Sequence, residues 1–361
     1  MNEFPSNHSR EFHERIHQRP LGALSDFDIE RMPASLAEIR AGTSTTKSLV
    51  GDVGTMIAGL SPQTVNDALA DQRARDIAGL DLKMLDAAVA HSEGEVPVVL
   101  QFLVDIFAVR SGQPGGISYE EIVLINPPSD RRLFTVGEVG KTEEAFYEMH
   151  RVVEGHLDSA IDATTQSIER LSLDGATAAN DVVSQLQQTQ EDLNSVIEGV
   201  HAVGTQNREH FGIFRAYLNS HPTRGTKGPS GAFTAGIPTI ELLLAGEQLP
   251  DEYRHYIDEN NIYFSRKGRK DLERAREFAS KGMTLTAISQ HLENPPLLAE
   301  NINSLSDLMR RFRGEHYKTA RNQVPEAIAG SVAGTGGETN PGFFLRGRMK
   351  IRHIKGEQYG E

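Results

Sequence analysis

Residues 305–320, the most informative stretch of the chain, read LSDLMRRFRGEHYKTA. In a helix, Leu305, Met309, Phe312 and His316 share one face because they are spaced by four, three and four residues. The imidazole of His316 therefore lies at the end of an apolar stripe. Two interpretations are open for such a histidine: a hydrogen-bonded core residue, or an axial ligand of a haem iron.

The chain has no cysteine among its 361 residues. This excludes disulfides, thiolate zinc and iron–sulfur sites, a cysteine nucleophile, and haem held by a thiolate or a thioether bond. A haem iron in this protein must therefore be held by histidine or, as alternatives, by tyrosine or methionine.

Charge and hydropathy limit the class of protein further. The net charge of −13 opposes attraction to nucleic acid, so we expect no nucleic-acid partner. The sequence has no run of eighteen apolar residues, and its first twenty residues lack the apolar core of a signal peptide. We therefore expect a cytoplasmic protein that is not inserted in a membrane.

Most of the chain follows helical periodicity, which predicts an all-α fold. Helices are expected over residues 47–90 (with a break at Ser61-Pro62), 96–109, 142–171, 178–202 and 238–244, and from about residues 250, 267 and 285. The most apolar run, 96–109, is expected to be a buried helix whose Gln101 either finds a partner or lies at its edge. A short strand is expected over 121–125.

The expected organisation has three parts. An N-terminal segment, 1–95, contains small helices, and its first 46 residues are expected to wrap the surface or cap a partner subunit. A main helical domain covers 96–345, and a tail covers 346–361.

Residues 210–218 read HFGIFRAYL, an aromatic segment in a chain with only 6% aromatic residues. Arg215 lies among Phe211, Phe214 and Tyr217, and a guanidinium in such surroundings suits bidentate binding of a carboxylate. The alternative is an ion pair with an Asp or Glu at the rim of a pocket. The loop at 223–236, TRGTKGPSGAFTAG, lacks the pattern of a phosphate loop, but its small residues allow close approach to a ligand or a helix.

Four segments, taken in order, resemble the superfamily of haem-dependent indoleamine and tryptophan 2,3-dioxygenases, including its monodechloroaminopyrrolnitrin synthase branch. They are the apolar helix with Val104-Asp105-Ile106, the aromatic segment 210–218, the loop and helix 228–246, and the His316 helix with the later Gly334-Thr335-Gly336-Gly337. The resemblance spans about two thirds of the chain, from 96 to 339. It implies an all-α bundle of that type, with 96–345 as the haem-binding domain.

The resemblance also implies how the cofactor is held. In this superfamily the histidine on the late helix is the proximal ligand, which implies His316 as the axial ligand of the iron. Ala320 stands where tyrosine-hydroxylating relatives carry a haem-linking cysteine, which implies a noncovalent haem b. Ser230 and Gly231 match loop residues that lie over the haem, and are implied as cofactor-binding residues.

The substrate and catalytic residues follow from the same resemblance. Arg215 matches an arginine that pairs with a substrate carboxylate, and Thr335 matches a threonine on a mobile loop that closes over the site. His210 stands where relatives carry a pocket-wall aromatic, and Gln101 where they carry a distal Ser or His. An imidazole can accept or donate a proton where a phenyl ring cannot. The implied catalytic residues are His210, Gln101 and Ser230, and the implied substrate-binding residues are Phe211, Arg215, Gly231, Phe233 and Thr335.

The implied function is a haem-dependent oxygenase of specialised metabolism. It would insert one or two oxygen atoms, from O2 or peroxide, into a small aromatic substrate such as an indole or tryptophan derivative. There are two alternatives, because fold alone does not fix function. One is a haem sensor or transport protein, and the other is a haem-free helical binding protein of the same fold. Relatives with long N-terminal segments often associate, so a homodimer or homotetramer is an option beside the monomer.

Overall fold

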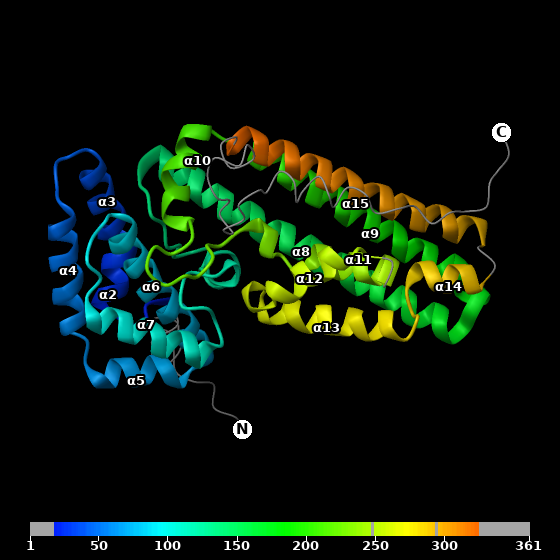
Figure 1. The fold of residues 1–361 in the computed structure, drawn as a ribbon, viewed down its shortest axis with the longest axis horizontal. Coiled ribbons are helices and arrows are strands. Elements are labelled where there is room, and N and C mark those ends of the chain that lie inside the picture. Colours follow the sequence, from blue (N-terminus) through cyan, green and yellow to red (C-terminus); the bar gives the residue numbers. More distant parts are fainter. Residues whose placement is uncertain (1–17, 247–248, 293–294, 325–361) are drawn as a thin grey trace, which may run out of the picture. The chain divides into compact units, whose positions relative to one another are not determined.

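The structure is a computed structural model and describes residues 18–246, 249–292 and 295–324. Every regular element in these residues is a helix, which confirms the expected all-α class (Figure 1). No helix in these ranges is both long enough and apolar enough to cross a bilayer. Thr335 with its glycine-rich loop, and the expected tail 346–361, lie outside the described residues.

Contacts divide the chain into two compact units. Unit 1 holds the described residues 18–148 and 207–230, and unit 2 holds the described residues from 149–206 and from 231 onward. The boundary expected after residue 95 lies inside unit 1. The chain passes from unit 1 to unit 2 within one long helix, α8 (Gly137–Asp174).

Unit 1 is built around α6 (Gln72–His91), whose residues from Asp76 to Ala90 are all buried. Helices α4, α5, α7 and η4 pack against it. The elements of unit 1 are α2 (Ala23–Asp26), η1 (Phe27–Arg31), α3 (Met32–Arg40), α4 (Thr46–Ala58), α5 (Pro62–Ala70), α6, α7 (Val98–Ser111), η2 (Glu120–Ile125), the start of α8, α10 (Arg208–Arg215) and η4 (Ala216–Leu218).

The expected break at Ser61-Pro62 is confirmed. The Ser61 hydroxyl accepts a hydrogen bond from the Thr64 amide, and Pro62 takes the first helical position of α5. Asp71 caps α6 in the same way by accepting from the Ala74 amide. These caps satisfy amides that have no partner inside the helix, which fixes where each helix begins.

The expectation that the first 46 residues wrap the surface is wrong for the part described. Leu21, Leu24, Phe27, Met32 and Leu36 are at most 4% exposed, so this segment belongs to the core of unit 1. Its apolar residues are spaced by three to five positions, which is helical spacing, and α2, η1 and α3 bury them together.

The expected strand at 121–125 is also wrong. Residues Glu120–Ile125 form the π-helix η2, in which the Asn126 amide donates to the Glu121 carbonyl at 2.9 Å. Its β-branched residues favour a strand by propensity, but the Glu121 side chain is drawn inward to Lys83 of α6 at 2.6 Å. A tertiary contact has overridden a local preference.

Unit 2 is a helical bundle whose central helix is α11 (Gly236–Ala245), buried from Gly236 to Leu244. The long α15 (Pro296–Gln323) runs alongside α9 (Ala179–Gly204), and α13 and α14 pack against α11 (Figure 1). The remaining elements of unit 2 are the rest of α8, η3 (Gly175–Ala178), η5 (Gly231–Phe233), α12 (Asp251–Glu259), η7 (Asn261–Tyr263), α13 (Arg266–Ser280) and α14 (Leu285–His291).

Candidate functional site

Helix α15 carries the predicted iron ligand. Leu305, Met309 and Phe312 are buried at 0%, 3% and 8% exposure, so the predicted apolar face is confirmed as part of the core of unit 2. His316 follows on this face and is half-buried, with its ring 5.8 Å from the Phe312 ring. The imidazole thus lies where the buried stripe reaches more accessible space.

Polar contacts fix the rotation of α15 about its own axis. The Thr319 hydroxyl donates to the Val200 carbonyl at 3.1 Å, and the Gln323 amide donates to the Val203 carbonyl at 2.9 Å. The His201 Nδ1 lies 2.7 Å from Glu315 Oε1, and this hydrogen bond lowers the pKa of Glu315. These contacts lie on both sides of His316 in the sequence, so its backbone position is well determined.

A buried ion pair adds a second anchor. Arg313, one turn before His316, pairs with Glu241 of α11, and the two side chains are at most 3% exposed. The Arg313 guanidinium also lies over the Tyr253 ring, 5.6 Å from its centroid. An arginine held by both contacts joins α15 to the centre of unit 2.

His316 is a residue type that can ligate a haem iron. A haem iron takes four nitrogens from its porphyrin and needs only one or two protein ligands, for which a neutral imidazole is well suited. The described residues contain no group of three or more His, Asp or Glu able to hold a bare metal ion. On α15, the imidazole of His316 is the side chain that would ligate the iron of a haem.

Helix α10 of unit 1 carries the predicted substrate residues. It begins where the Asn207 side chain accepts hydrogen bonds from the amides of Glu209 and His210. Phe211 and Phe214 are buried and form a three-ring cluster with Phe146, with centroid distances of 5.2–5.5 Å. Edge-to-face packing of this kind orients the helix.

His210 is half-buried, and its contacts define its tautomer. Its Nδ1 lies 2.9 Å from the Thr142 hydroxyl oxygen, and that hydroxyl donates to the Glu138 carbonyl at 3.0 Å. A hydroxyl has one proton, so His210 must donate from Nδ1. The neutral ring then presents Nε2 as a proton acceptor, which is the state that a general base needs.

Arg215 is half-buried and ends α10 one turn after Phe211, so the two residues lie on the same side of the helix. Tyr217 turns into the core instead: its ring stacks on Phe134 at 5.1 Å, and its hydroxyl accepts from Arg40 at 2.9 Å. The described part of unit 1 thus brings His210, Phe211 and Arg215 onto one short helix.

Gln101 takes one of the two positions that the sequence left open. It lies on the exposed side of α7, and its amide donates to the Val96 carbonyl at 2.9 Å, close to the start of the helix. The expected burial of this whole helix is wrong, because only the face toward α6 is covered. Of the two roles open for Gln101, the structure places it at the helix edge.

The glycine-rich loop holds its backbone close to neighbouring elements. A Cβ at Gly228 would lie 2.1 Å from the Leu218 carbonyl oxygen, so only glycine fits there. Ser230, half-buried, ends the part of this loop that belongs to unit 1.

Gly231 and Phe233 belong to unit 2. A Cβ at Gly231 would lie 3.2 Å from the Nε2 of His150, so the loop passes close to this imidazole of α8. Phe233 is 1% exposed and stacks on Tyr263 at 5.0 Å, which is the environment of a core residue.

Sequence reasoning missed the charges buried in unit 1. Asp76, Asp81, Lys83 and Asp86 of α6 are at most 5% exposed, although charged residues on a helix are normally solvated. Lys83 pairs with Glu121 at 2.6 Å; burial lowers the pKa of Lys83, and the Glu121 charge opposes this. The signal in the sequence was four charges within eleven residues of an otherwise alanine- and leucine-rich helix.

The most enclosed group is formed by Asp28, Asp81 and Arg132, all at 0% exposure. Asp81 accepts from Arg132 Nε at 2.7 Å and from the Ser25 hydroxyl at 2.8 Å. Neither oxygen of Asp28 accepts a hydrogen bond, and burial, followed by the charge of Asp81, raises its pKa well above the usual value. Burial and the neighbouring Asp81 charge thus favour the protonated form of the Asp28 carboxyl.

We expect the stability of unit 1 to fall as pH rises because of Asp28. An unfolded Asp releases its proton near pH 3.9, whereas folded Asp28 keeps it to a higher pH, so between these values the folded state binds more protons. Urea unfolding at pH 5 and pH 8 should therefore show a smaller pH-dependent loss in Asp28→Asn, whose amide also donates a hydrogen bond. An equal loss in parent and variant would contradict the assignment.

Two hollows formed by described residues lie away from the predicted residues. In unit 1, His91, Tyr217 and His221 line a space of about 10 Å³, which holds about one water. His221 Nε2 lies 3.3 Å from Asp86 there, and burial, then the neighbouring His221, lowers the pKa of His91 to about 4. This space is too small for an aromatic substrate.

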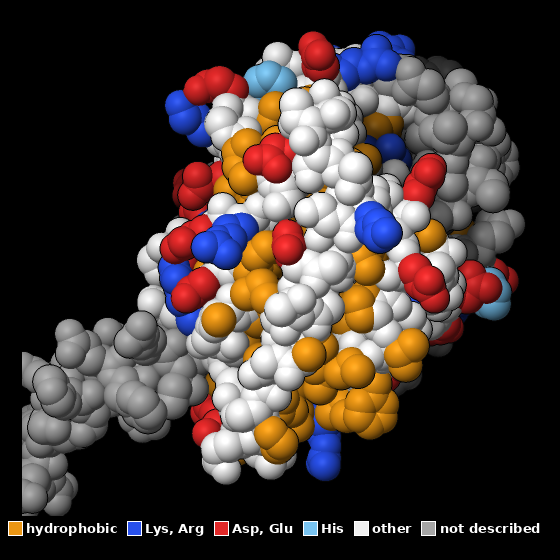
Figure 2. Space-filling view, turned by 90° about the vertical axis from the view of Figure 1, so that its left-hand side faces the viewer, with side chains coloured by type: hydrophobic (Ala, Val, Ile, Leu, Met, Phe, Trp, Pro, Cys, Tyr) orange, Lys and Arg blue, Asp and Glu red, His pale blue; other side chains and the backbone are white. Residues whose placement is uncertain are grey.

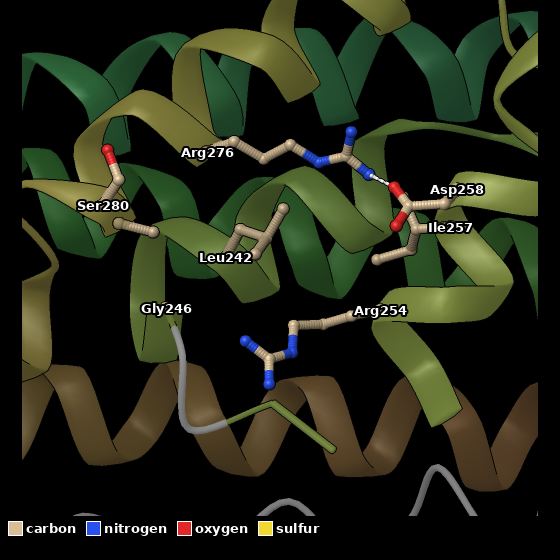
Figure 3. Close-up of a pocket in the computed structure, with 8 residues that line it drawn as sticks. Leu242, Gly246, Arg254, Ile257, Asp258, Arg276 and Ser280 are labelled. Carbon is tan, nitrogen blue, oxygen red and sulfur yellow. Dashed lines mark hydrogen bonds and ion pairs between the residues drawn. The ribbon is translucent and has the colours of Figure 1, made fainter. Parts of the chain in front are cut away.

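The second hollow, of about 320 Å³, lies among α11, α12 and α13 of unit 2. Figure 3 shows Arg276 and Arg254 on opposite sides of it, with Leu242 between them. Arg276 pairs with Asp258, which also lines the hollow, and Arg254 pairs with Asp251. Asp251 itself does not line the hollow.

No protein-family model matches this chain, and no curated protein matches it. The assignment of function therefore depends on the residues themselves.

Proposed function

We propose that this protein is a haem-dependent oxygenase that acts on a small aromatic substrate, an indole or tryptophan derivative. The observation that carries the proposal is His316, a half-buried imidazole at the end of a buried apolar stripe on a helix held in fixed rotation. The resemblance of the sequence to indoleamine and tryptophan dioxygenases supports the same role.

In this proposal His316 would hold the haem iron through one ring nitrogen and donate a hydrogen bond from the other, which fixes the ring. Bound haem, with O2 or peroxide, supplies the oxidising chemistry that inserts oxygen into an electron-rich ring. His210 would accept a proton at Nε2, because its Nδ1 proton is committed to the Thr142 hydroxyl. Arg215 would bind the carboxylate of an amino-acid substrate, and Phe211 would pack against its ring.

The test is a haem titration of the purified full-length protein, followed by a panel of tryptophan, tyrosine and indole derivatives. We expect a Soret band at one haem per chain, substrate-induced shifts of that band with indoles, and turnover with O2 or peroxide. A protein that stays colourless would support a haem-free binding protein. Haem uptake without substrate-dependent shifts or turnover would support a sensor or transport protein.

Arg215→Ala should weaken binding of an amino-acid substrate far more than binding of the bare aromatic ring. A charge-assisted hydrogen bond contributes about 1.5–3 kcal/mol, which corresponds to a rise in Kd of about 10- to 150-fold for the amino acid. Substrate titrations followed by the Soret shift measure both values.

Arg208→Ala, at the exposed start of the same helix, is the control and should change neither dissociation constant. Equal losses for both ligands in Arg215→Ala would refute the carboxylate role.

A further inference from the structure

Unit 1 leaves one face of α7 uncovered. Val98, Val99, Phe102 and Val109 are 78%, 56%, 63% and 80% exposed, and helical spacing places them on one side. The opposite side, with Leu100, Val104 and Phe107, is fully buried. Of the ten large hydrophobic residues exposed among those described, four lie on this single helix, so the exposure is concentrated in one patch.

This patch is unusual for a surface. Figure 2 shows hydrophobic side chains gathered in one area of the face that is turned to the viewer. A helix that is apolar all round is normally covered all round, because exposed apolar surface is unfavourable in water. Exposed apolar side chains grouped on one face of a helix indicate a candidate interaction site.

We propose that this face binds the same face of a second copy of the chain, with the two α7 helices antiparallel about a two-fold axis. The charges at the ends of the face support this arrangement. Glu95, just before α7, and Arg110, near its end, are both exposed. Antiparallel pairing places Glu95 of each copy beside Arg110 of the other, whereas parallel pairing would bring like charges together.

The middle of the face is self-complementary in a register that differs from this by about half a residue. Gln101 and Asp105 are equally distant from position 103, so each Gln101 amide meets the Asp105 carboxylate of the other copy. Asp105 already pairs with Arg224 at 2.5 Å, yet its side chain is 63% exposed and its second oxygen can accept. Phe102 lies near the centre, where it packs against the partner and is shielded from water.

A membrane surface is a less suitable occupant. The chain carries a net charge of −13, and Glu95 lies at the end of the face and Asp105 in its middle, so an anionic lipid surface would be repelled. A second copy would bury the apolar side chains at the centre of the face and pair the charges at its ends.

Sedimentation equilibrium of the full-length protein across the micromolar range tests the proposal. We expect a concentration-dependent species with twice the chain mass of 39.7 kDa. Phe102→Glu should raise the dimer Kd by at least about 30-fold, because it places charges in the centre of the contact. Leu173→Glu is the matched control: Leu173 is 84% exposed on α8, outside the patch, and its replacement should leave the Kd unchanged.

Charge reversal tests the antiparallel register. Arg110→Glu alone should weaken the dimer, because it faces Glu95 of the other copy, and adding Glu95→Arg should restore it. A monomer at all concentrations overturns the proposal, whatever else then covers the face. So does a dimer that Phe102→Glu leaves intact, and so does a double reversal that associates no better than Arg110→Glu.

Discussion

The His316→Ala protein is expected to show no Soret band after addition of haem, under conditions in which the parent protein takes up one equivalent. Loss of a group that merely orients a ligand weakens metal binding about 10- to 100-fold, so loss of the ligand itself should exceed this range. The chain has no cysteine that could replace His316 as the iron ligand. Titration of each protein with haem, followed by absorption spectroscopy, measures the difference.

His201→Ala is the matched control for this experiment. His201 is more than half exposed on α9 and hydrogen-bonds to Glu315, the residue before His316, so its loss perturbs the same region without removing the proposed ligand. It should keep the Soret band. Far-UV circular dichroism should show folded protein for both variants, and added imidazole should restore part of the band in His316→Ala. An unchanged spectrum in His316→Ala would remove the ligand assignment.

Arg132→Met is expected to destabilise unit 1 by about 3–5 kcal/mol, the usual cost of leaving a buried charge without its partner. The variant removes the donor that lies 2.7 Å from Asp81, in a group where Asp28, Asp81 and Arg132 are all fully buried. Amide hydrogen exchange of α6 measures the loss locally, with the amides of α11 in unit 2 as an internal reference.

A surface ion pair provides the control for Arg132. Arg170 pairs with Asp181, but their side chains are 45% and 60% exposed, so Arg170→Met should cost less than about 1 kcal/mol. Adding Asp81→Asn to Arg132→Met should recover part of the stability, since the unpaired charge is then gone. A loss in Arg132→Met no larger than in Arg170→Met would show that Asp81 is not dependent on this arginine.

The helices of the candidate site were predictable from sequence, but the surroundings of its residues were not. The spacing of Leu305, Met309 and Phe312 predicted the buried face that ends at His316, because helical periodicity is a local property. The tautomer of His210 was not predictable. It depends on Thr142 and Glu138, which lie about seventy residues earlier in the chain.

The expectations that failed depended on contacts between residues distant in sequence. Residues 121–125 favour a strand by composition, but Lys83 draws Glu121 into a π-helix. The apolar run at 96–109 predicted a buried helix, because its composition is the same on both faces. Composition alone does not show which face of α7 is covered.

By itself the sequence determined the all-α class, the helix break at Ser61-Pro62, the buried stripe before His316 and the exclusion of every cysteine-dependent chemistry. Tertiary structure decided that the charges of α6 are buried, that Gln101 lies at an exposed edge and that one face of α7 is left open. The physical reason is that caps and periodicity act within a few residues. Burial of a charge or exposure of an apolar face is set by the segments that pack against it, and most of these are distant in sequence.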